Sequence, residues 1–263
     1  MVGHLKPYKA KVLASIDSFF RFVGKAVVMS DDIANFKERS EVMQRIAHKL
    51  IDIGEIKSLY GERCSVLPQW FGSSLMEVDR SLLSWFGFPS IGVHLNGIVQ
   101  DEKNKHMWLS HRSPNLFSFP NKLDNLVAGG HGASTNLQGT LYQECYEEAL
   151  ISKDLASKSI LTSLITFCVD HGNKFRRGAV FCYDLNLPRD WIPKNEDGEA
   201  SQFELLEINE VLRIVKNTTS FKFNSALVII DYMIRNGHIS SSEKDFVEIV
   251  SGLRQSPSEL LWK

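Results

Sequence analysis

Residues 129–150 read GGHGASTNLQGTLYQECYEEAL, and this stretch decides which fold the rest of the chain is expected to adopt. Its second half suits a helix and carries three carboxylates, Glu144, Glu147 and Glu148. At about 3.6 residues per turn, positions i, i+3 and i+4 lie on one side of a helix. The like charges repel one another weakly, but a divalent cation that collects their oxygens makes the arrangement favourable. A solvated acidic helix face is the alternative interpretation.

A short apolar run, Leu126-Val127-Ala128, suits the end of a strand, and Gly129-Gly130 follow it directly. Glycines let the backbone turn sharply or approach a ligand closely. The order of strand, glycine loop and acidic helix resembles the signature of the Nudix hydrolases. That signature has a Gly, a first Glu, an Arg-Glu pair, an aliphatic residue, two adjacent Glu, a Gly and a last aliphatic residue. The matching positions here are Gly129, Glu144, Cys145, Glu147, Glu148 and Ile151.

Three positions depart from this signature. Thr135 stands in place of the first Glu, Gln143 in place of the Arg and Leu150 in place of the final Gly. The first two losses are expected to be coupled, because an ion pair that loses one partner leaves the other charge stranded. Without the Gly, the helix is expected to continue into Ile151-Ser152 or to stop by another route. An inactive Nudix fold stays an alternative, since motif matches include false positives.

The segments around the box narrow the resemblance to one branch. They occur in a consistent order at residues 92–97, 107–113, 123–130, 183–185, 197–199, 203–205 and 223–228. Over roughly residues 30–245 this order is similar to that of proteins related to the Nudix part of thiamine pyrophosphokinase-fused enzymes. The resemblance implies a family-specific N-terminal region and conversion of thiamine diphosphate, above all its damaged oxo and oxy forms, to the monophosphate. The alternatives are hydrolysis of another nucleoside diphosphate derivative, such as ADP-ribose, and a catalytically silent diphosphate-binding module.

The expected fold is of the α/β class, a Nudix α/β/α sandwich preceded by a small N-terminal α+β region. We place the N-terminal region at residues 1–88 and the hydrolase domain at residues 89–250. Apolar spacing predicts helical structure at residues 31–54, opened by acidic capping residues and closed by Gly54, and a second periodic segment at 75–86. Further expectations are a hairpin around residues 101–105, strands at 163–170 and 179–185, helices at 208–215 and 224–236, and a peripheral end from about Ser251.

The acidic helix predicts a magnesium site. Mg²⁺ prefers oxygen ligands, usually takes one or two carboxylates and shares its other positions with waters and substrate phosphates. Glu144 and Glu148 are the first-choice ligands, and Glu147 is a third ligand or the catalytic group that orients the attacking water. Mn²⁺ is the alternative ion. A separate catalytic base is expected at Glu199 or Glu204, although an isolated Glu is more often a surface carboxylate.

Substrate contacts are expected from both parts of the chain. Arg112 ends a predicted strand beside the box and is suited to grip a phosphate in bidentate fashion, with a surface salt bridge as the alternative. The backbone of Gly129 and Gly130 is expected to approach the diphosphate closely. Aromatic side chains offer faces for a cationic or heteroaromatic ring, with a role in the core as the alternative; we select Trp70 and Phe119. We further expect the N-terminal region to shape substrate choice through Trp70, Phe71, Arg80 and Trp85.

Composition agrees with this assignment but does not identify it. The 263 residues are 43% hydrophobic and 23% charged, with a net charge of −1, so a sequence-independent nucleic-acid partner is not expected. The four cysteines show no close pairing and are expected to be reduced and buried. No membrane association is expected, because no apolar run is long enough to span a bilayer. The cytoplasm is the expected location, with targeting to an organelle by the lysine-rich N-terminus as the alternative. A small-molecule diphosphate is the expected partner, and a homodimer is left open.

Overall fold

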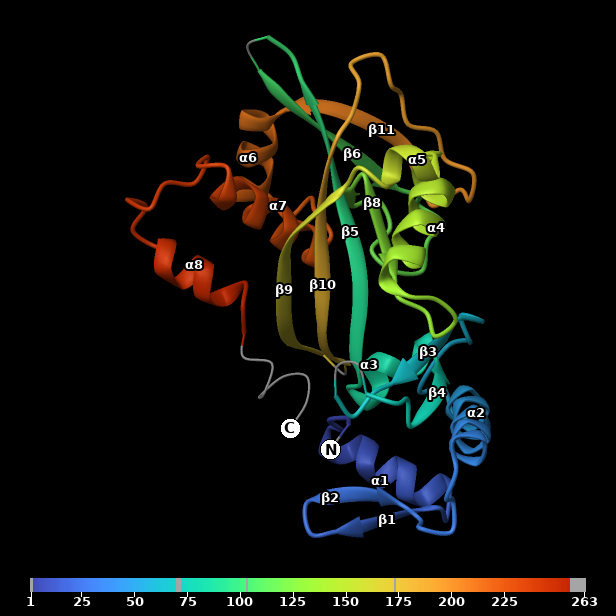
Figure 1. Ribbon diagram of the computed structural model, residues 1–263. Helices are drawn as coiled ribbons and strands as arrows, with labels where there is room; N and C mark the ends of the chain where they lie inside the picture. Colours follow the sequence, from blue (N-terminus) through green and yellow to red (C-terminus); the bar gives the residue numbers. More distant parts are fainter. Residues whose placement is uncertain (1, 70–71, 103, 173, 256–263) are drawn as a thin grey trace.

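The computed structural model describes residues 2–69, 72–102, 104–172 and 174–255 (Figure 1). The first 88 residues contain short helices and two small hairpins. In chain order these elements are α1 (Pro7–Ile16), β1 (Phe20–Val23), β2 (Ala26–Met29), α2 (Phe36–Asp52), β3 (Arg63–Val66), β4 (Met76–Asp79), the 3-10 helix η1 (Arg80–Leu82) and α3 (Leu83–Phe86).

The following residues form a large sheet with its covering helices. The strands are β5 (Pro89–Gln100), β6 (Lys105–Arg112), β7 (Leu123–Asn125), β8 (Val127–Gly130), β9 (Ile160–His171), β10 (Lys174–Asn186) and β11 (Ala200–Glu207). The helices are α4 (Leu137–Ala149), α5 (Lys153–Ala156), α6 (Ile208–Asn217), α7 (Phe223–Arg235) and α8 (Phe246–Gly252).

The large sheet is mixed and is organised around strand β5. Its order is β11-β6-β5-β10-β9, with β7 paired to β6 and β8 paired to β5. Strand β5 pairs in parallel with β10, and antiparallel with β8 near its start and with β6 near its end. Because β8 leads directly into the loop before α4, the pairing of β5 with β8 fixes the start of the acidic helix against the sheet.

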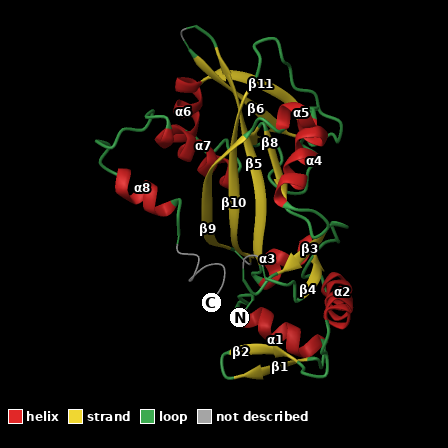
Figure 2. Ribbon diagram, viewed as in Figure 1, coloured by secondary structure: helices red, strands yellow, loops and turns green. Residues whose placement is uncertain are grey.

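Helices cover both faces of this sheet, as Figure 2 shows for α4 and α5 on one side and α6 and α7 on the other. Side chains alternate along β5, because successive residues of a strand point to opposite faces. Val93, Leu95 and Val99 pack with Leu141 and Cys145 of α4. On the opposite face, an apolar cluster joins the sheet to α6 and α7 through Ile98, Met107, Leu109, Val211, Ile229 and Met233. The predicted α/β/α sandwich is therefore confirmed.

The N-terminal residues have an apolar core of their own. It is built around α2, whose Val42, Ile46 and Leu50 are buried, together with residues of both small hairpins and of α3. Helix α2 ends at Asp52, and Gly54, with a φ of 77°, closes it directly after the C-cap Ile53, as predicted. Its N-cap is Asn35, whose side chain accepts the Glu38 N–H, and not an acidic residue. The predicted periodic segment at 75–86 was wrong as one element. Strand β4 ends at Asp79, which caps η1 by accepting the Ser81 N–H at 2.9 Å.

Most other element predictions are confirmed. The hairpin is β5–β6, the two later strands are β9 and β10, and the two later helices are α6 and α7. Residues 253 and 254 are less peripheral than expected, because Leu253 is buried and Arg254 forms an ion pair with Asp231 of α7. The described part of the chain contains no helix with both the length and the apolar character needed to cross a bilayer. All four cysteines are unpaired, and Cys168 is only half-buried, contrary to the expectation.

The hairpin β3–β4 lies against the glycine loop that precedes α4 (Figure 1). At the start of β3, the Arg63 carbonyl accepts a hydrogen bond from the Ala133 N–H at 2.9 Å. The hairpin's other strand leads into Arg80, whose guanidinium lies beside Gly130. The N-terminal residues thus form one wall of the space above the acidic helix.

Candidate active site

Helix α4 carries the acidic residues, and its two ends are fixed by local contacts. Asn136 caps the N-terminus, since its side chain accepts the Gly139 N–H at 2.8 Å. At the other end, Leu150 itself takes the left-handed conformation with φ 50°, and the Ile151 N–H donates back to the Cys145 carbonyl. Of the two expected outcomes, the helix does not continue into Ile151-Ser152 but stops without a glycine. Leu150 accepts the strained conformation because the buried Ile151 holds the chain there.

Glu144 and Glu148 lie one turn apart at the edge of the buried face of α4. Glu148 is buried, and its Oε2 accepts the Ala128 N–H of β8 at 2.7 Å. Burial, and then the charge of Glu144, raise the pKa of Glu148 well above its ordinary value. Burial, and then the charge of Glu147, raise the pKa of Glu144 to about 7. Both carboxyls therefore hold a proton more strongly than an ordinary glutamate, and a bound cation would relieve the same repulsion.

The glycines before the helix are required for space. A Cβ atom at Gly129 would lie closer than 3.0 Å to the Glu144 carboxyl group, and one at Gly130 would lie 3.0 Å from Cζ of Arg80. Neither glycine has a positive φ, so a left-handed backbone is not the reason for glycine here. Both belong to β8, and their missing side chains leave room for Glu144 and Arg80. The expected approach of their backbone to the diphosphate stays a prediction.

The carboxylates of α4 are the candidate ligands for the expected metal ion. Within the described ranges, no group of three or more His, Cys, Asp or Glu side chains is close enough together to hold a metal ion. Glu147 is half-buried and accepts a hydrogen bond from Gln143 Nε2 at 3.1 Å. The remaining pair, Glu144 and Glu148, fits Mg²⁺ or Mn²⁺, because such hard ions take one or two carboxylates and complete their shell with waters and phosphate oxygens.

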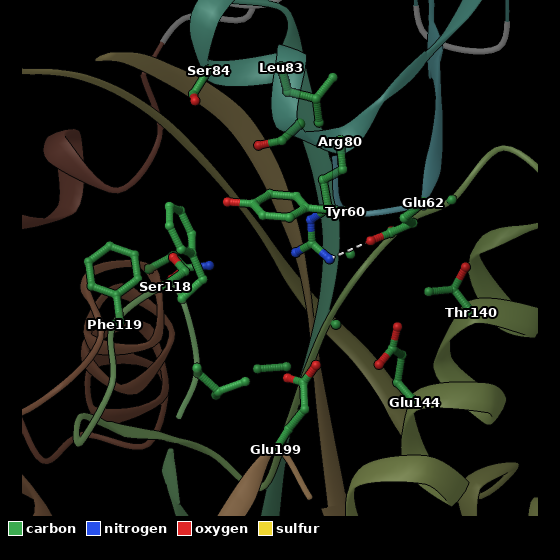
Figure 3. Close-up of a pocket in the computed structure, with 18 of the residues that line it drawn as sticks. Tyr60, Glu62, Arg80, Leu83, Ser84, Ser118, Phe119, Thr140, Glu144 and Glu199 are labelled. Atoms are coloured by element: carbon green, nitrogen blue, oxygen red, sulfur yellow. Dashed lines mark hydrogen bonds and ion pairs between the residues drawn. The ribbon is translucent and has the colours of Figure 1, made fainter. Parts of the chain in front are cut away.

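A cavity of about 970 Å³ opens above these carboxylates. Figure 3 shows Glu144 and Glu199 reaching into it from two sides, with Arg80 and Tyr60 of the N-terminal part on a third. The loop between β6 and β7 supplies the remaining wall with Phe117 and Phe119. The cavity is therefore acidic at the helix, and aromatic and basic at the opposite wall.

Two aromatic contacts shape that wall. The rings of Tyr60 and Phe117 meet edge to face with centroids 5.9 Å apart, so the loop of the sheet part touches the N-terminal part. The Arg176 guanidinium lies over the Phe119 ring at 5.0 Å. Phe119 also has a positive φ of 52°, a strained conformation for an aromatic residue. It lines the cavity, and its contact with the substrate stays a prediction.

Arg112 lines the cavity, but its donors are already in use. Its Nη1 donates to Asp124 at 3.0 Å, while Nε and Nη2 donate to the Ser118 carbonyl. Lys222 donates to the same Asp124 carboxylate at 2.8 Å. Burial alone would raise the pKa of Asp124, but the Lys222 charge, the charge of His94 and the hydrogen bonds from Lys222 and Ser225 together hold the pKa below its ordinary value. Arg112 therefore stabilises the loop that carries Phe119, and these contacts do not leave its guanidinium open to bind a phosphate.

The two candidate bases are not brought together. Glu199 lines the cavity, 48% exposed, with its Oε2 4.0 Å from Arg112 Nη1. Its backbone is fixed, because the Glu199 N–H donates to Asp197 and its carbonyl accepts the Ser113 N–H. Glu204 is not among the residues lining the cavity and instead lies 3.0 Å from His111 Nε2 on β6.

Of the substrate contacts predicted in the N-terminal region, one lines the cavity and the others do not or lie outside the described residues. Trp70 and Phe71 lie outside the described residues. Trp85 does not line the cavity: it is buried in the N-terminal core, and its indole N–H donates to Glu55 at 3.0 Å. Arg80 does line the cavity. Sequence reasoning missed Tyr60, Glu62 and Lys222, none of which stands in a motif.

Comparisons with known proteins show which family the chain resembles. A family model described as "Domain of unknown function (DUF4743)" matches residues 1–90. Nudix hydrolase 20, chloroplastic, of Arabidopsis thaliana is 35% identical over 220 residues, and the match covers 83% of this chain but only 58% of that protein. Nudix hydrolase 24, chloroplastic, of the same plant is 31% identical over 256 residues, covering 97% of this chain and 70% of that protein. A solved structure, the NUDIX domain of Shewanella oneidensis NrtR complexed with ADP ribose, is 11% identical with a TM-score of 0.44, covering 56% of this chain and 88% of that one. The extent of the match to the second plant protein shows that this chain belongs to the Nudix hydrolase family.

Proposed function

We propose that this protein is an Mg²⁺-dependent diphosphatase that converts thiamine diphosphate, or its damaged oxo and oxy forms, to the monophosphate. The observation that carries the proposal is the composition of one cavity. The acidic face of α4 and an aromatic wall from Tyr60, Phe117 and Phe119 line the same space of about 970 Å³. A diphosphate needs the first surface, and a flat, cationic organic group gains from the second.

The polar residues have separate roles in this proposal. Glu144 and Glu148 would hold the ion, which offsets phosphate charge and makes a bound water more acidic. Glu147, held by Gln143, orients the attacking water. Glu199 accepts the proton of that water as its oxygen attacks phosphorus. The bond from phosphorus to the bridging oxygen then breaks, and orthophosphate and the monophosphate ester leave. Of the two candidate bases, Glu199 is favoured over Glu204, because Glu199 lines the cavity.

A substrate panel tests the proposal. Thiamine diphosphate, its oxo form, ADP-ribose and a nucleoside diphosphate are each incubated with the protein and Mg²⁺, and phosphate and monophosphate release are followed. We expect the highest kcat/KM for the thiamine compounds. Glu148→Gln is expected to abolish turnover without unfolding, because the amide oxygen still accepts the Ala128 N–H. Glu41→Gln, at an exposed position of α2, is the matched control and should retain wild-type turnover.

The outcomes separate the three candidate functions. A preference for ADP-ribose or the nucleoside diphosphate would replace the proposed substrate by the second Nudix chemistry. Saturable binding of all four compounds without turnover would favour a silent diphosphate-binding module. Unchanged turnover by Glu148→Gln at limiting Mg²⁺ would contradict the role given to this carboxylate.

The cytoplasm stays the proposed location, and a chloroplast or other organelle is the alternative, since both plant relatives carry "chloroplastic" in their names. Imaging of a fluorescent fusion to the full-length gene product distinguishes the two. A homodimer stays a prediction that sedimentation velocity can test.

A further inference from the structure

The Nudix box of this chain lacks its own charged pair, because Thr135 and Gln143 stand at those positions. A different pair lies at the same cavity. Glu62 and Arg80 of the N-terminal part form an ion pair with Nη1 2.7 Å from Oε2, and both line the cavity together with Thr135 and Gln143. Figure 3 shows this pair above the space between Glu144 and Glu199.

Arg80 is held in place by the end of the β3–β4 hairpin. The Arg80 N–H donates to the Glu62 carbonyl at 2.9 Å, and the buried Asp79 carboxylate accepts the N–H groups of Tyr60, Gly61 and Ser81. A carboxylate that accepts three backbone donors fixes the loop on which Glu62 stands. The Glu62–Arg80 ion pair is therefore held by a backbone segment that hydrogen bonds to Asp79 fix in place.

The guanidinium reaches the box itself. It packs on Gly130, where a Cβ atom would be only 3.0 Å from Cζ of Arg80. Burial alone would lower the pKa of Arg80, but the charge and hydrogen bond of Glu62, with smaller contributions from Cys64 and Glu144, together raise the pKa. Arg80 is thus close enough for its charge to act on Glu144, and its side chain, 46% exposed, lines the cavity.

The other cations that line the cavity are placed differently. Arg112 and Lys222 donate to Asp124, and Arg176 lies over the Phe119 ring. Arg177 donates to the carbonyls of Gly87 and Val2. Arg63 approaches the glycine loop through its backbone carbonyl. Among the described residues, Arg80 donates a hydrogen bond only to Glu62, so its remaining N–H groups face the cavity beside the box.

We propose that Arg80, positioned by Glu62, binds the diphosphate of the substrate opposite the carboxylates of α4, so that the N-terminal region supplies the cation that the altered box lacks. Nη1 stays paired with Glu62, and the other guanidinium N–H groups donate to phosphate oxygens. A planar guanidinium suits this task, because it can bind a carboxylate and a phosphate at once in fixed directions. This inference rests on the proposed diphosphate substrate and assigns part of its recognition to residues outside the box.

The test measures binding of inorganic pyrophosphate in the presence of Mg²⁺ by isothermal titration calorimetry, with the full chain. We expect Arg80→Ala to weaken pyrophosphate binding by about 10- to 100-fold, the range typical of a lost hydrogen bond to a charged group. Arg80→Lys should fall in between, because it keeps the charge but loses the fixed second donor. Free guanidinium ion should partly restore binding to Arg80→Ala, which a merely structural role would not allow.

The control is Arg21→Ala, which removes an exposed arginine of the same N-terminal part, paired with Asp31 at 3.1 Å and far along the chain from the cavity wall. It should leave the affinity within about twofold, as expected of a surface ion pair. Should Arg80→Ala fail to fold, Arg80→Lys and Glu62→Gln decide the matter, since both are expected to weaken binding.

Several results would overturn the inference: wild-type affinity in the folded Arg80 variants, a larger loss in Arg63→Ala than in Arg80→Ala, or no pyrophosphate binding by the wild type. Tight, Arg80-dependent pyrophosphate binding without turnover of any diphosphate would instead overturn the proposed function and leave the inference standing.

Discussion

Replacing Gly129 by alanine tests how α4 is fitted to the sheet. The added Cβ would lie closer than 3.0 Å to the Glu144 carboxyl group, a separation that real Cβ atoms essentially never show. Because Gly129 has no positive φ, alanine fits its backbone, and the clash is with a side chain alone. We therefore expect Glu144 to turn away from the cavity while β8 keeps its pairing with β5.

The size of the effect follows from that displacement. To reach an ordinary contact of 3.4 Å, the Glu144 carboxyl has to move by about 1 Å or take another rotamer. A misplacement of about 1 Å in a catalytic group costs about 100-fold in rate, so kcat/KM is expected to fall by about that factor. The free energy of unfolding should change by only about 1 kcal/mol, because an off-rotamer side chain costs no more than that.

The assay combines turnover with metal binding. Phosphate release gives kcat/KM, electron paramagnetic resonance of Mn²⁺ gives the metal affinity, and thermal melting checks the fold. The matched control is Gly132→Ala in the same loop, where a Cβ atom would make an ordinary contact of 3.5 Å with the Arg63 carbonyl, and it should behave as wild type. If Gly129→Ala stays folded and keeps both Mn²⁺ affinity and turnover within about threefold of wild type, the position of Glu144 over Gly129 does not matter for the site.

The pKa of Glu144 stands at about 7 through burial and the charge of Glu147, so Mg²⁺ must displace a proton; calorimetry should show Mg²⁺ affinity falling as pH drops below that value. Without metal, the stability of the fold should change with pH in the opposite direction, because a carboxyl group with a raised pKa stabilises the folded state only while it is protonated. The melting temperature should therefore fall as pH rises from the ordinary Glu range through about 7. A rise of the melting temperature over this pH range would contradict the shift. The double variant Thr135→Glu with Gln143→Arg should fold, and a double-mutant cycle should show a coupling of about 0.5 kcal/mol or more in the free energy of unfolding. Gln143→Arg alone should stabilise the protein less. Additive effects of the two substitutions would contradict the idea that the two charges were lost together. Tyr60→Ala should raise KM for thiamine diphosphate several-fold but leave KM for inorganic pyrophosphate unchanged, and equal effects on both would remove the aromatic wall from substrate recognition.

The sequence determined the features that local geometry controls. The spacing of Glu144, Glu147 and Glu148 is enough to place them on one side of α4, because the helical repeat fixes which residues share a face. Short apolar runs separated by turn residues likewise predicted β5, β6, β9 and β10, because such runs are typical of strands. The box residues that resemble the Nudix signature therefore named the fold before any long-range contact was considered.

Only the tertiary structure decided which residues share the cavity. Arg80 and Glu144 are 64 positions apart in the chain, and no local pattern marks a contact made between a hairpin end and a helix. The same is true of Glu199 and Glu204, which look equivalent in sequence but differ because only Glu199 lines the cavity. The sequence predicted that Arg112 binds a phosphate, yet in the structure its guanidinium donates to Asp124 and to the Ser118 carbonyl.

At Gly129 and at Leu150, too, the sequence decided one part of the local structure and the tertiary contacts decided the other. The sequence indicated that Gly129 permits a close approach, but the folded chain decided that the approaching group is Glu144. At Leu150, propensity argued against a left-handed helix end, and the burial of Ile151 imposed it. Local preferences are worth about 1 kcal/mol or less per residue, whereas burying one large apolar side chain is worth about 1.5–3 kcal/mol, so packing overrides propensity where the two disagree.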